Sequence, residues 1–521
     1  MDLKRTVLGL ELGSTRIKAV LLDENHIPVA AGGYDWENKL VDGIWTYAME
    51  EIHAGLRGSF AELAADVERK FGQKLTTVGA IGISAMMHGY LPFDRDGNQL
   101  AMFRTWRNTV TGEAAGILSR EFRFHIPQRW SVSHLYQAMR NREPYLSRLD
   151  YMTTLSGYIH WKLTGKRVLG ICDASGMFPI DSETMDYDQT MEAVFNALAA
   201  EYPWKLRDVF PRVLCAGGDA GVLTEAGARF LDPSGTLQPG IPMAPPEGDG
   251  GTGMVATNSV RERVGNVSAG TSVFAMVVAD HKLGVHEEID MVTTPAGKPV
   301  AMVQCNNCTT DINAWVELLR QFAAVMGMEA DRGEIFQRLF RLALEGEADG
   351  GGLLSCNYYS GEHLTGLTEG RPLFLRTPNA NFTLANFMRT HLMSALASLK
   401  IGLNILVGEE QARIVKIYGH GGFFKTPGVG QRILSAAVKA PVSVMETAGE
   451  GGPYGMALLA AYLLRREPGE TLEDYLDNKV FSAATATTLM ADEADIAGFE
   501  TYAARYLRAL PVERAAVETV G

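Results

Sequence analysis

The stretch "LGLELGSTRIKAVLLD" (residues 8–23) contains two apolar runs separated by three small residues. Apolar residues alternate over 6–12, the pattern stops at Gly13-Ser14-Thr15, and alternation resumes over 16–22. Alternation with a period of two on both sides of a short turn predicts a β-hairpin. The sequence therefore begins with two paired strands whose tip is small and polar.

The tip of this hairpin has the composition of a phosphate-binding turn. Glycine at Gly13 lets the backbone approach a ligand, and successive N–H groups beside hydroxyls form a concavity that binds anions. Glu11 precedes the turn and could hold Mg²⁺ directly or through water, while Lys18 follows it and would offset phosphate charge. The alternative is a solvent-exposed hairpin tip with two charged strand ends.

A second hairpin of the same kind is predicted in "VGNVSAGTSVFAMVVAD" (264–280), where Gly270-Thr271-Ser272 separates two apolar runs. Two such hairpins half a chain apart indicate a duplicated domain. The Pro- and Gly-rich stretch 237–254 precedes the second copy and is the best boundary. We therefore expect domains over 1–257 and 258–521.

The segments that follow the first hairpin predict an α/β domain. Residues 24–36 indicate a turn and a strand, and the helical spacing of apolar residues over 49–71 predicts a helix. Residues 78–94 indicate a buried strand, a loop and another strand. Strands followed by alternating helices and strands are typical of the α/β class.

Composition limits the class of protein. A chain of 521 residues is too long for one core, so two or three domains are expected. The net charge of −13 argues against nucleic acid or an anionic membrane as a partner. We find no signal peptide and no apolar run of membrane-spanning length, and five cysteines are too few for a disulfide framework. A cytoplasmic protein is expected.

Cys305 and Cys308 form a C-x-x-C in "VQCNNCTT". No second Cys or His pair completes a metal site, so we interpret them as two small residues where a strand ends.

A candidate catalytic carboxylate lies in "PPEGDGGTGMVATN" (245–258), where glycines flank Asp249 on both sides. Its backbone is therefore free to approach a ligand. A sugar hydroxyl is a poor nucleophile at neutral pH, and a carboxylate within hydrogen-bond reach can take its proton during phosphoryl transfer. An Asp-Gly turn in a linker is the alternative.

Two further glycine clusters precede predicted helices. In "IYGHGGFFKTPGVGQRILSAAV" (417–438) an apolar strand leads into Gly419 to Gly422, and a helix follows from about Gly428. Glycines at a strand-to-helix turn allow a ring or a phosphate to lie against the backbone, although the spacing is not that of a P-loop. The cluster in 446–462 opens another apolar helix, where close helix packing is the alternative.

Taken together, these motifs resemble the FGGY family of carbohydrate kinases from Leu8 to about Leu464. That family has two actin-like (ribonuclease-H-like) α/β domains with a cleft between them. The family's opening motif is matched by Gly9, Glu11, Gly13, Ser14, Thr15 and Lys18, and its catalytic Asp is matched by Asp249. Its second phosphate loop is matched by Gly270, Thr271 and Ser272. Its nucleotide-binding glycine run is matched by Gly419 to Gly422, with Phe423 following. The stretches 158–165, 173–181 and 358–366 are also similar to family motifs.

The resemblance extends to a sugar site. "ISAMMHG" (83–89) is similar to the segment of xylulose kinases in which a Met and a His line the sugar pocket, which implies that role for Met87 and His88. "RTWRN" (104–108) is similar to the family's sugar segment, with Trp106 kept and Asn108 in place of the usual Asp. A loop Met and His packed in the core is the alternative for the first segment.

The resemblance implies an ATP-dependent kinase that uses Mg²⁺, with ATP bound by the second domain and a ketopentose of the D-xylulose or L-ribulose type by the first. Another polyol or a ketohexose is an alternative substrate. A small-molecule sugar is the expected partner, without nucleic acid or membrane, and a homodimer is compatible with the sequence.

Three residues depart from the family pattern: Glu11 for Asp, Asn108 for Asp, and His420 within the glycine run. They leave open a noncatalytic sugar sensor of the same fold. An actin- or chaperone-like ATPase shares the hairpins but would not need the Met87-His88 segment.

Overall fold

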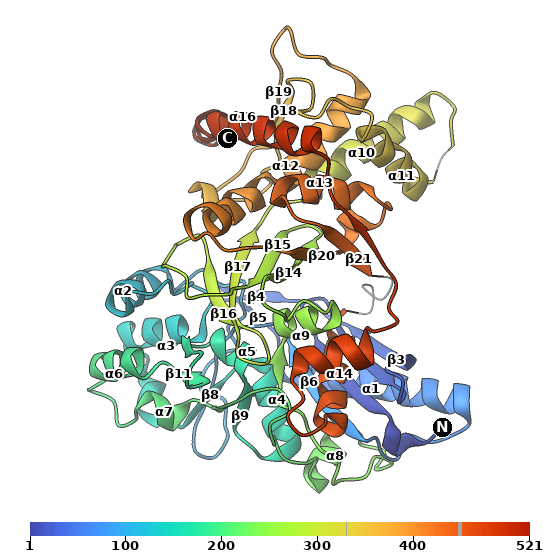
Figure 1. Ribbon diagram of the computed structural model, residues 1–521. Helices are drawn as coiled ribbons and strands as arrows, with labels where there is room; N and C mark the ends of the chain where they lie inside the picture. The colour runs from blue at the N-terminus through green and yellow to red at the C-terminus, as the bar shows by residue number, and fades with distance from the viewer. Residues whose placement is uncertain (330, 446–450, 521) are drawn as a thin grey trace. The chain divides into compact units, whose positions relative to one another are not determined.

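The computed structural model describes residues 1–329, 331–445 and 451–520, and the chain divides into two compact units (Figure 1). Unit 1 comprises Met1–Val260, Asp290–Val300 and Glu450–Ala483. Unit 2 comprises Arg261–Ile289, Ala301–Gly449 and Ala484–Gly521. A single cut between 257 and 258 therefore does not describe the units, because the chain returns to unit 1 twice after first leaving it.

The sheet of unit 1 contains the predicted first hairpin. Its strands lie in the order β13-β6-β1-β2-β3, with bounds β1 (Val7–Leu12), β2 (Arg16–Leu22), β3 (Pro28–Asp35), β6 (Ala80–Ala85) and β13 (Glu247–Gly248). β1 pairs antiparallel with β2, with Leu12 opposite Ile17, which confirms the hairpin. β6 runs parallel to β1, and β13 runs parallel to β6.

Helices cover both faces of this sheet. The predicted helix over 49–71 is present as α1 (Met49–Phe71), and α14 (Gly451–Arg465) covers the opposite face. A Cβ at Gly32 would lie 2.2 Å from the carbonyl oxygen of Ser59 in α1, and a Cβ at Gly9 would lie 2.0 Å from that of Pro453 in α14. Glycine at both positions lets the two helices lie directly on the strands.

The other elements of unit 1 surround that sheet. Among the strands and helices of this unit are β4 (Lys39–Val41), β5 (Ile44–Thr46), β7 (Leu91–Phe93), α2 (Gly112–Phe122), α3 (Ser131–Arg140), β8 (Tyr151–Thr153), α4 (Leu155–Thr164), β9 (Val168–Gly170), α5 (Ile171–Ser175), β10 (Ile180–Asp181), β11 (Asp186–Tyr187), α6 (Gln189–Leu198), α7 (Leu206–Val209), β12 (Arg212–Leu214), α8 (Glu225–Leu231), α9 (Asp249–Ala256), β16 (Asp290–Thr293) and α15 (Leu472–Tyr475). The core under β1 and β2 is almost entirely aliphatic and aromatic.

The sheet of unit 2 repeats the strand arrangement of unit 1. Its strands lie in the order β17-β15-β14-β20-β21-β22, with bounds β14 (Val264–Ala269), β15 (Val273–Val278), β17 (Pro299–Cys305), β20 (Lys416–His420), β21 (Val442–Met445) and β22 (Ala486–Leu489). β14 and β15 form the predicted second hairpin, with Ala269 opposite Val273. β20 runs parallel to β14, and β21 runs parallel to β20.

The helices of unit 2 include one long apolar helix. They include α10 (Thr310–Val325), α11 (Arg332–Ala343), α12 (Leu384–Asn404), α13 (Val429–Val438) and α16 (Glu493–Thr519). By length and composition alone, the helical stretch Leu384–Glu409 could cross a membrane, but 72% of its most apolar window is buried within the protein. It also carries a buried Arg389 that pairs with Asp495 of α16, as expected of a core helix.

Candidate functional site

The tip of the first hairpin is held from one side by aromatic residues. Trp36 Nε1 donates a 2.7 Å hydrogen bond to the carbonyl oxygen of Gly13, and the Tyr47 hydroxyl donates a 2.5 Å hydrogen bond to that of Ser14. The backbone N–H of Trp36 donates to the carbonyl oxygen of Thr15. Within the described residues, the N–H groups of Ser14 and Thr15 have no acceptor. A turn with fixed carbonyls and uncommitted N–H groups is suited to an anion.

Glu11 and Lys18 lie opposite each other in the register of the same hairpin. Glu11 is buried, and its Oε2 lies 3.8 Å from Lys18 Nζ. Burial raises the pKa of Glu11 to about 7, the Lys18 charge works against this, and the negative charge of Asp249 adds to it. The electrostatic coupling links the hairpin tip to the candidate base.

The oxygens around Glu11 fit Mg²⁺ as a ligand set. A Cβ at Gly452 would lie 2.1 Å from Glu11 Oε1 and 3.2 Å from Thr252 Oγ1, so carboxylate and hydroxyl border one glycine. Among the described residues no group of three or more His, Cys, Asp or Glu could hold a metal ion. Mg²⁺ keeps several waters and uses substrate phosphates as ligands, so one carboxylate with nearby hydroxyls suits it.

Asp249 is the first residue of α9 and directly follows β13. Because β13 runs parallel to β6, with Gly248 beside Ala85, the carboxyl ends of the two strands lie side by side. Met87, just after β6, donates its backbone N–H to Asp249 Oδ1 over 3.0 Å. The side chain is partly buried, and this burial raises the pKa of Asp249. The carboxylate is thus oriented by a fixed donor at a sheet edge where α/β proteins bind ligands.

His88 lies beside this carboxylate segment but is fully engaged with the protein. Arg129 Nε donates to His88 Nε2 over 3.1 Å, so Nδ1 carries the ring proton and donates to the carbonyl oxygen of Gly176, also over 3.1 Å. Burial and the Arg129 charge lower the pKa of His88 to about 3. Both ring nitrogens therefore have partners within the protein, and neither is left for a ligand, although the resemblance implied that His88 lines the sugar pocket.

Met87 packs against the strand that leads to Asp249. A Cβ at Gly248 would lie 2.2 Å from Met87 Cγ, so glycine is needed for this contact. The Met87 side chain is buried. It is an apolar wall next to the Asp249 carboxylate, and its contact with a sugar stays a prediction.

Sequence reasoning missed Arg129 and its partners. Arg129 forms an ion pair with Asp290, and His125 Nε2 lies 3.3 Å from the other oxygen of the same carboxylate. The Arg129 and His125 charges hold the pKa of Asp290 well below its usual range against the effect of burial. No motif surrounds Arg129, so nothing in the sequence distinguishes it from a surface cation.

Asp173 is a second residue that was not assigned a role. It is completely buried and accepts hydrogen bonds from the hydroxyls of Thr154, over 2.7 Å, and Ser156. Burial raises its pKa to about 7, and the nearby Asp249 charge contributes. The stretch "DASGMFPID" that resembled a family motif begins at this residue, and that signal could have identified it.

In the expected sugar segment, the side chain of Trp106 contacts the first hairpin, whereas that of Asn108 is hydrogen-bonded to the backbone of Trp45 and Thr105. Trp106 Nε1 donates to Ser14 Oγ over 3.2 Å. The Asn108 amide donates to the carbonyl oxygens of Trp45 and Thr105 and accepts from the N–H of Trp45. Asn108 is buried and its donors are used, which revises the expectation that it contacts substrate.

In unit 2, the tip of the second hairpin is held by the segment after β17. Thr309 donates its backbone N–H to the carbonyl oxygen of Gly270, and Cys308 donates its own to that of Thr271. A Cβ at Gly270 would meet no atom of the described residues within 4 Å, so this part of the chain leaves the position open. Cys305 and Cys308 are buried free thiols where β17 ends, as interpreted from the sequence.

The glycine run after β20 approaches the second hairpin closely. Gly421 has φ +98°, and a Cβ there would lie 2.5 Å from the carbonyl oxygen of Ala269, whereas a Cβ at Gly422 would meet nothing within 4 Å among the residues that the structure describes. Phe423 is completely buried, with its ring 6.3 Å from that of Phe340. This revises the expectation for Phe423, because its side chain belongs to the core and only its backbone borders the turn.

His420 and the last glycine cluster complete the predicted positions. His420 is the last residue of β20, and burial lowers its pKa to about 4, so it is neutral at physiological pH. In the cluster 446–462, residues 446–450 lie outside the described residues, and α14 begins at Gly451.

The chain matches the models of both halves of one family. Residues 6–255 match the N-terminal domain, and 265–464 the C-terminal domain, of the FGGY family of carbohydrate kinases. Xylulose kinase from Haemophilus influenzae is 21% identical over 421 residues, covering 76% of this chain and 79% of that protein. The crystal structure of ligand-bound xylulose kinase from Lactobacillus acidophilus covers 99% of both chains with a TM-score of 0.79 at 16% identity. That of gluconate kinase from Lactobacillus acidophilus covers 99% of this chain and 98% of that chain with a TM-score of 0.79 at 17% identity.

Proposed function

Since this chain belongs to the FGGY family of carbohydrate kinases, we propose that it transfers the γ-phosphoryl group of ATP to a terminal hydroxyl of a ketopentose. It has the family's actin-like α/β fold and is an ATP-dependent sugar kinase. The finer proposal concerns the sugar, the residues that act and the metal.

Asp249 is the proposed general base. The observation that carries this role is its place at the junction of β13 and α9, where Met87 N–H holds one carboxylate oxygen and burial raises its pKa. A raised pKa makes the carboxylate a better acceptor for the proton that the sugar hydroxyl loses as it attacks the phosphoryl group. In the proposed step Asp249 takes the hydroxyl proton, and the hydroxyl oxygen forms a bond to the γ-phosphorus as the bond to the ADP oxygen breaks.

The hairpin tips are the proposed phosphate-binding groups. In unit 1 the N–H groups of Ser14 and Thr15, with Gly13 and Lys18, would stabilise the charge that develops on the transferred phosphoryl oxygens. In unit 2 the turns at Gly270-Thr271 and Gly421-Gly422 would hold the nucleotide, because each presents backbone that faces open space. Mg²⁺, when held near Glu11, would screen phosphate charge.

The proposed sugar site lies in unit 1. Met87 supplies an apolar surface for C–H groups, Trp106 supplies a ring next to Ser14, and His88 acts through Arg129 and Gly176 to shape the segment. A ketopentose is favoured because two of the similar proteins reported above are xylulose kinases. The gluconate kinase among the similar structures keeps a sugar acid as the second candidate.

A coupled assay for ADP release over D-xylulose, L-ribulose, D-ribulose, glycerol and gluconate tests the proposal. We expect the highest kcat/KM with one of the pentuloses. Preference for gluconate or glycerol would replace the ketopentose, and binding of a sugar without ADP release would favour a noncatalytic sensor. Sugar-independent ATP hydrolysis would favour an actin-like ATPase. We also propose a cytoplasmic location, consistent with the free thiols of all five cysteines.

A further inference from the structure

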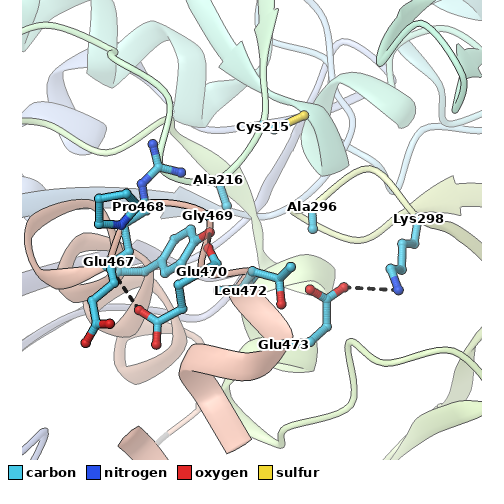
Figure 2. Close-up of a pocket in the computed structure, with 13 residues that line it drawn as sticks. Cys215, Ala216, Ala296, Lys298, Glu467, Pro468, Gly469, Glu470, Leu472 and Glu473 are labelled. Carbon is cyan, nitrogen blue, oxygen red and sulfur yellow. Dashed lines mark hydrogen bonds and ion pairs between the residues drawn. The ribbon is translucent and has the colours of Figure 1, made fainter. Parts of the chain in front are cut away.

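Unit 1 contains a cavity whose lining includes none of the candidate site residues. Its volume is about 650 Å³, within the range of small-molecule sites, about 300–1,000 Å³. Figure 2 shows that it is built from separate segments of unit 1. Its lining consists of the loop after β12, the loop between β16 and β17, the end of α14, the loop that leads into α15, and the first two residues of α15, Leu472 and Glu473.

A buried carboxylate in this cavity has unused capacity. Glu473 is 5% exposed, and its Oε1 accepts no hydrogen bond from any described residue. Lys298 Nζ lies 3.4 Å from this oxygen, in the ion pair drawn in Figure 2. A buried carboxylate oxygen without a hydrogen bond is costly, and a ligand hydroxyl in the cavity would supply one.

The other carboxylates of the cavity are already satisfied. Lys479 lies 3.0 Å from Glu467 and 2.8 Å from Glu470, so it pairs with both. The lining carries three carboxylates and two cations, Lys298 and Arg466, and Lys479 supplies a third positive charge from beside the cavity through its pairs with Glu467 and Glu470. A balanced site gives no net attraction to a charged ligand, which favours a neutral one.

The remaining groups suit a polyhydroxylated molecule. The Tyr462 ring lines the cavity, with its hydroxyl donating to the carbonyl oxygen of Glu470, and Arg466 lies over the ring at 5.3 Å and donates to the carbonyl oxygen of Gly217. A ligand hydroxyl can donate a hydrogen bond to Glu473 Oε1, whereas an aliphatic ligand cannot. From this arrangement we propose that the cavity is a second binding site, specific for a small neutral polyol.

The cavity borders elements that carry the candidate base. Ala216 donates its N–H to the carbonyl oxygen of Pro295, and Pro295 Cγ lies 3.2 Å from the Cβ position of Gly251, two residues after Asp249. α14 reaches from Gly452, beside Glu11, to Tyr462 in the cavity. A polyol bound in the cavity therefore contacts elements that pack against the segment of Asp249, but it does not occupy the position of the sugar substrate.

Cys215 offers a local reporter in the unmodified protein. It lines the cavity and is half-buried, whereas the other four cysteines are buried. Burial raises the pKa of its thiol, so alkylation will be slow and is best followed at mildly alkaline pH. The rate at which N-ethylmaleimide labels the Cys215 peptide, read by mass spectrometry, reports on occupancy of the cavity.

The probes are glycerol, xylitol and myo-inositol, with inorganic phosphate as an anionic comparison. We expect at least one polyol to slow labelling saturably, and phosphate to have no effect. Glu473→Gln should weaken that protection about tenfold, since it removes a charged acceptor. Glu225→Gln, at an exposed i,i+4 pair with Arg229, is the matched control and should leave it unchanged.

Two further variants keep the test decisive. Ala296→Leu fills the cavity without removing a charge and should abolish protection, even if Glu473→Gln fails to fold. Trp106→Ala, which removes a ring from the proposed sugar site, should retain protection, and this separates the cavity from the sugar site whether or not the kinase proposal holds. The proposal would be overturned if none of the three polyols protected Cys215, or if phosphate protected it. It would also be overturned if Glu473→Gln and Ala296→Leu were protected as strongly as the parent protein.

Discussion

The two hairpins share one topology but differ in the charges next to their tips. In each hairpin we compare the cross-strand pair that is second from the turn. In unit 1 this pair is Glu11 opposite Lys18, and in unit 2 it is Ser268 opposite Phe274. The backbone arrangement was duplicated, whereas a buried carboxylate and its cation are present in one copy alone. The fold therefore supplies two turns of the same geometry, both proposed to bind anions, and side chains make one of them the candidate metal site.

The next strand of each sheet extends the contrast. After β6 the chain continues into Met87, whose side chain is apolar, and His88, whose ring is hydrogen-bonded within the protein. After β20 it continues into Gly421 and Gly422, which have no side chains. Side chains fill the first turn and are missing from the second. This difference accounts for assigning a sugar to unit 1 and a flat or phosphorylated ligand to unit 2.

The comparison is tested most severely by Asp249→Ala, which removes the proposed base from unit 1. We expect kcat to fall by about 10²–10⁴-fold with little change in the Kd of the sugar. Steady-state kinetics and calorimetric sugar titration measure the two quantities. Asp96→Ala, at an exposed aspartate of the same unit, is the control. Turnover within a few-fold of the parent would reject Asp249 as base.

Glu11→Gln removes the charge that distinguishes the first hairpin from the second. Its pKa of about 7 means that the carboxylate is charged above that pH and neutral below it. The Mg²⁺ concentration for half-maximal rate should therefore rise as pH falls through 7, and the variant should bind Mg²⁺ about 10–100-fold more weakly without that dependence.

Titrations of Mg²⁺ at several pH values measure this effect, with Glu50→Gln in α1 as control. The same pH dependence in Glu11→Gln and in the parent would assign the metal to another residue.

Gly421→Ala and Gly422→Ala sharpen the account of unit 2 as a matched pair. Alanine at 421 must adopt positive φ and clash with the carbonyl of Ala269, so the free energy of unfolding should fall by about 1–3 kcal/mol from φ alone, with the clash adding to this. Alanine at 422 enters open space and should keep the stability while raising the KM for ATP.

Chemical denaturation and ATP kinetics separate the two variants. If Gly422→Ala left the KM for ATP unchanged, this turn would not contact the nucleotide.

Asn108→Ala should have the smallest effect and should act on stability. Its amide holds Trp45 and Thr105, so we expect the free energy of unfolding to fall by about 1–2 kcal/mol. The KM for sugar should stay close to that of the parent. A large rise in that KM without loss of stability would restore Asn108 as a substrate contact.

Alternation and helical spacing predicted the hairpins, α1 and β6 well, because these patterns are local. The glycines on both sides of Asp249 are also a local signal, and the structure places this residue where β13 ends and α9 begins, while its role as base stays a prediction. The sequence could not predict that Arg129 and Gly176 occupy both nitrogens of His88, because both partners come from distant segments. For the same reason the burial of Phe423 against Phe340 was not foreseen.

The return of α14 to unit 1 has a consequence for how the protein is made. During synthesis β1 and β6 leave the ribosome within the first hundred residues, but the helix that covers Gly9 begins at Gly451. At about 5–20 residues per second this sheet face stays uncovered for tens of seconds, while all of unit 2 up to that point is translated. Nascent chains of this protein are therefore expected to need chaperone protection until almost the whole message has been read.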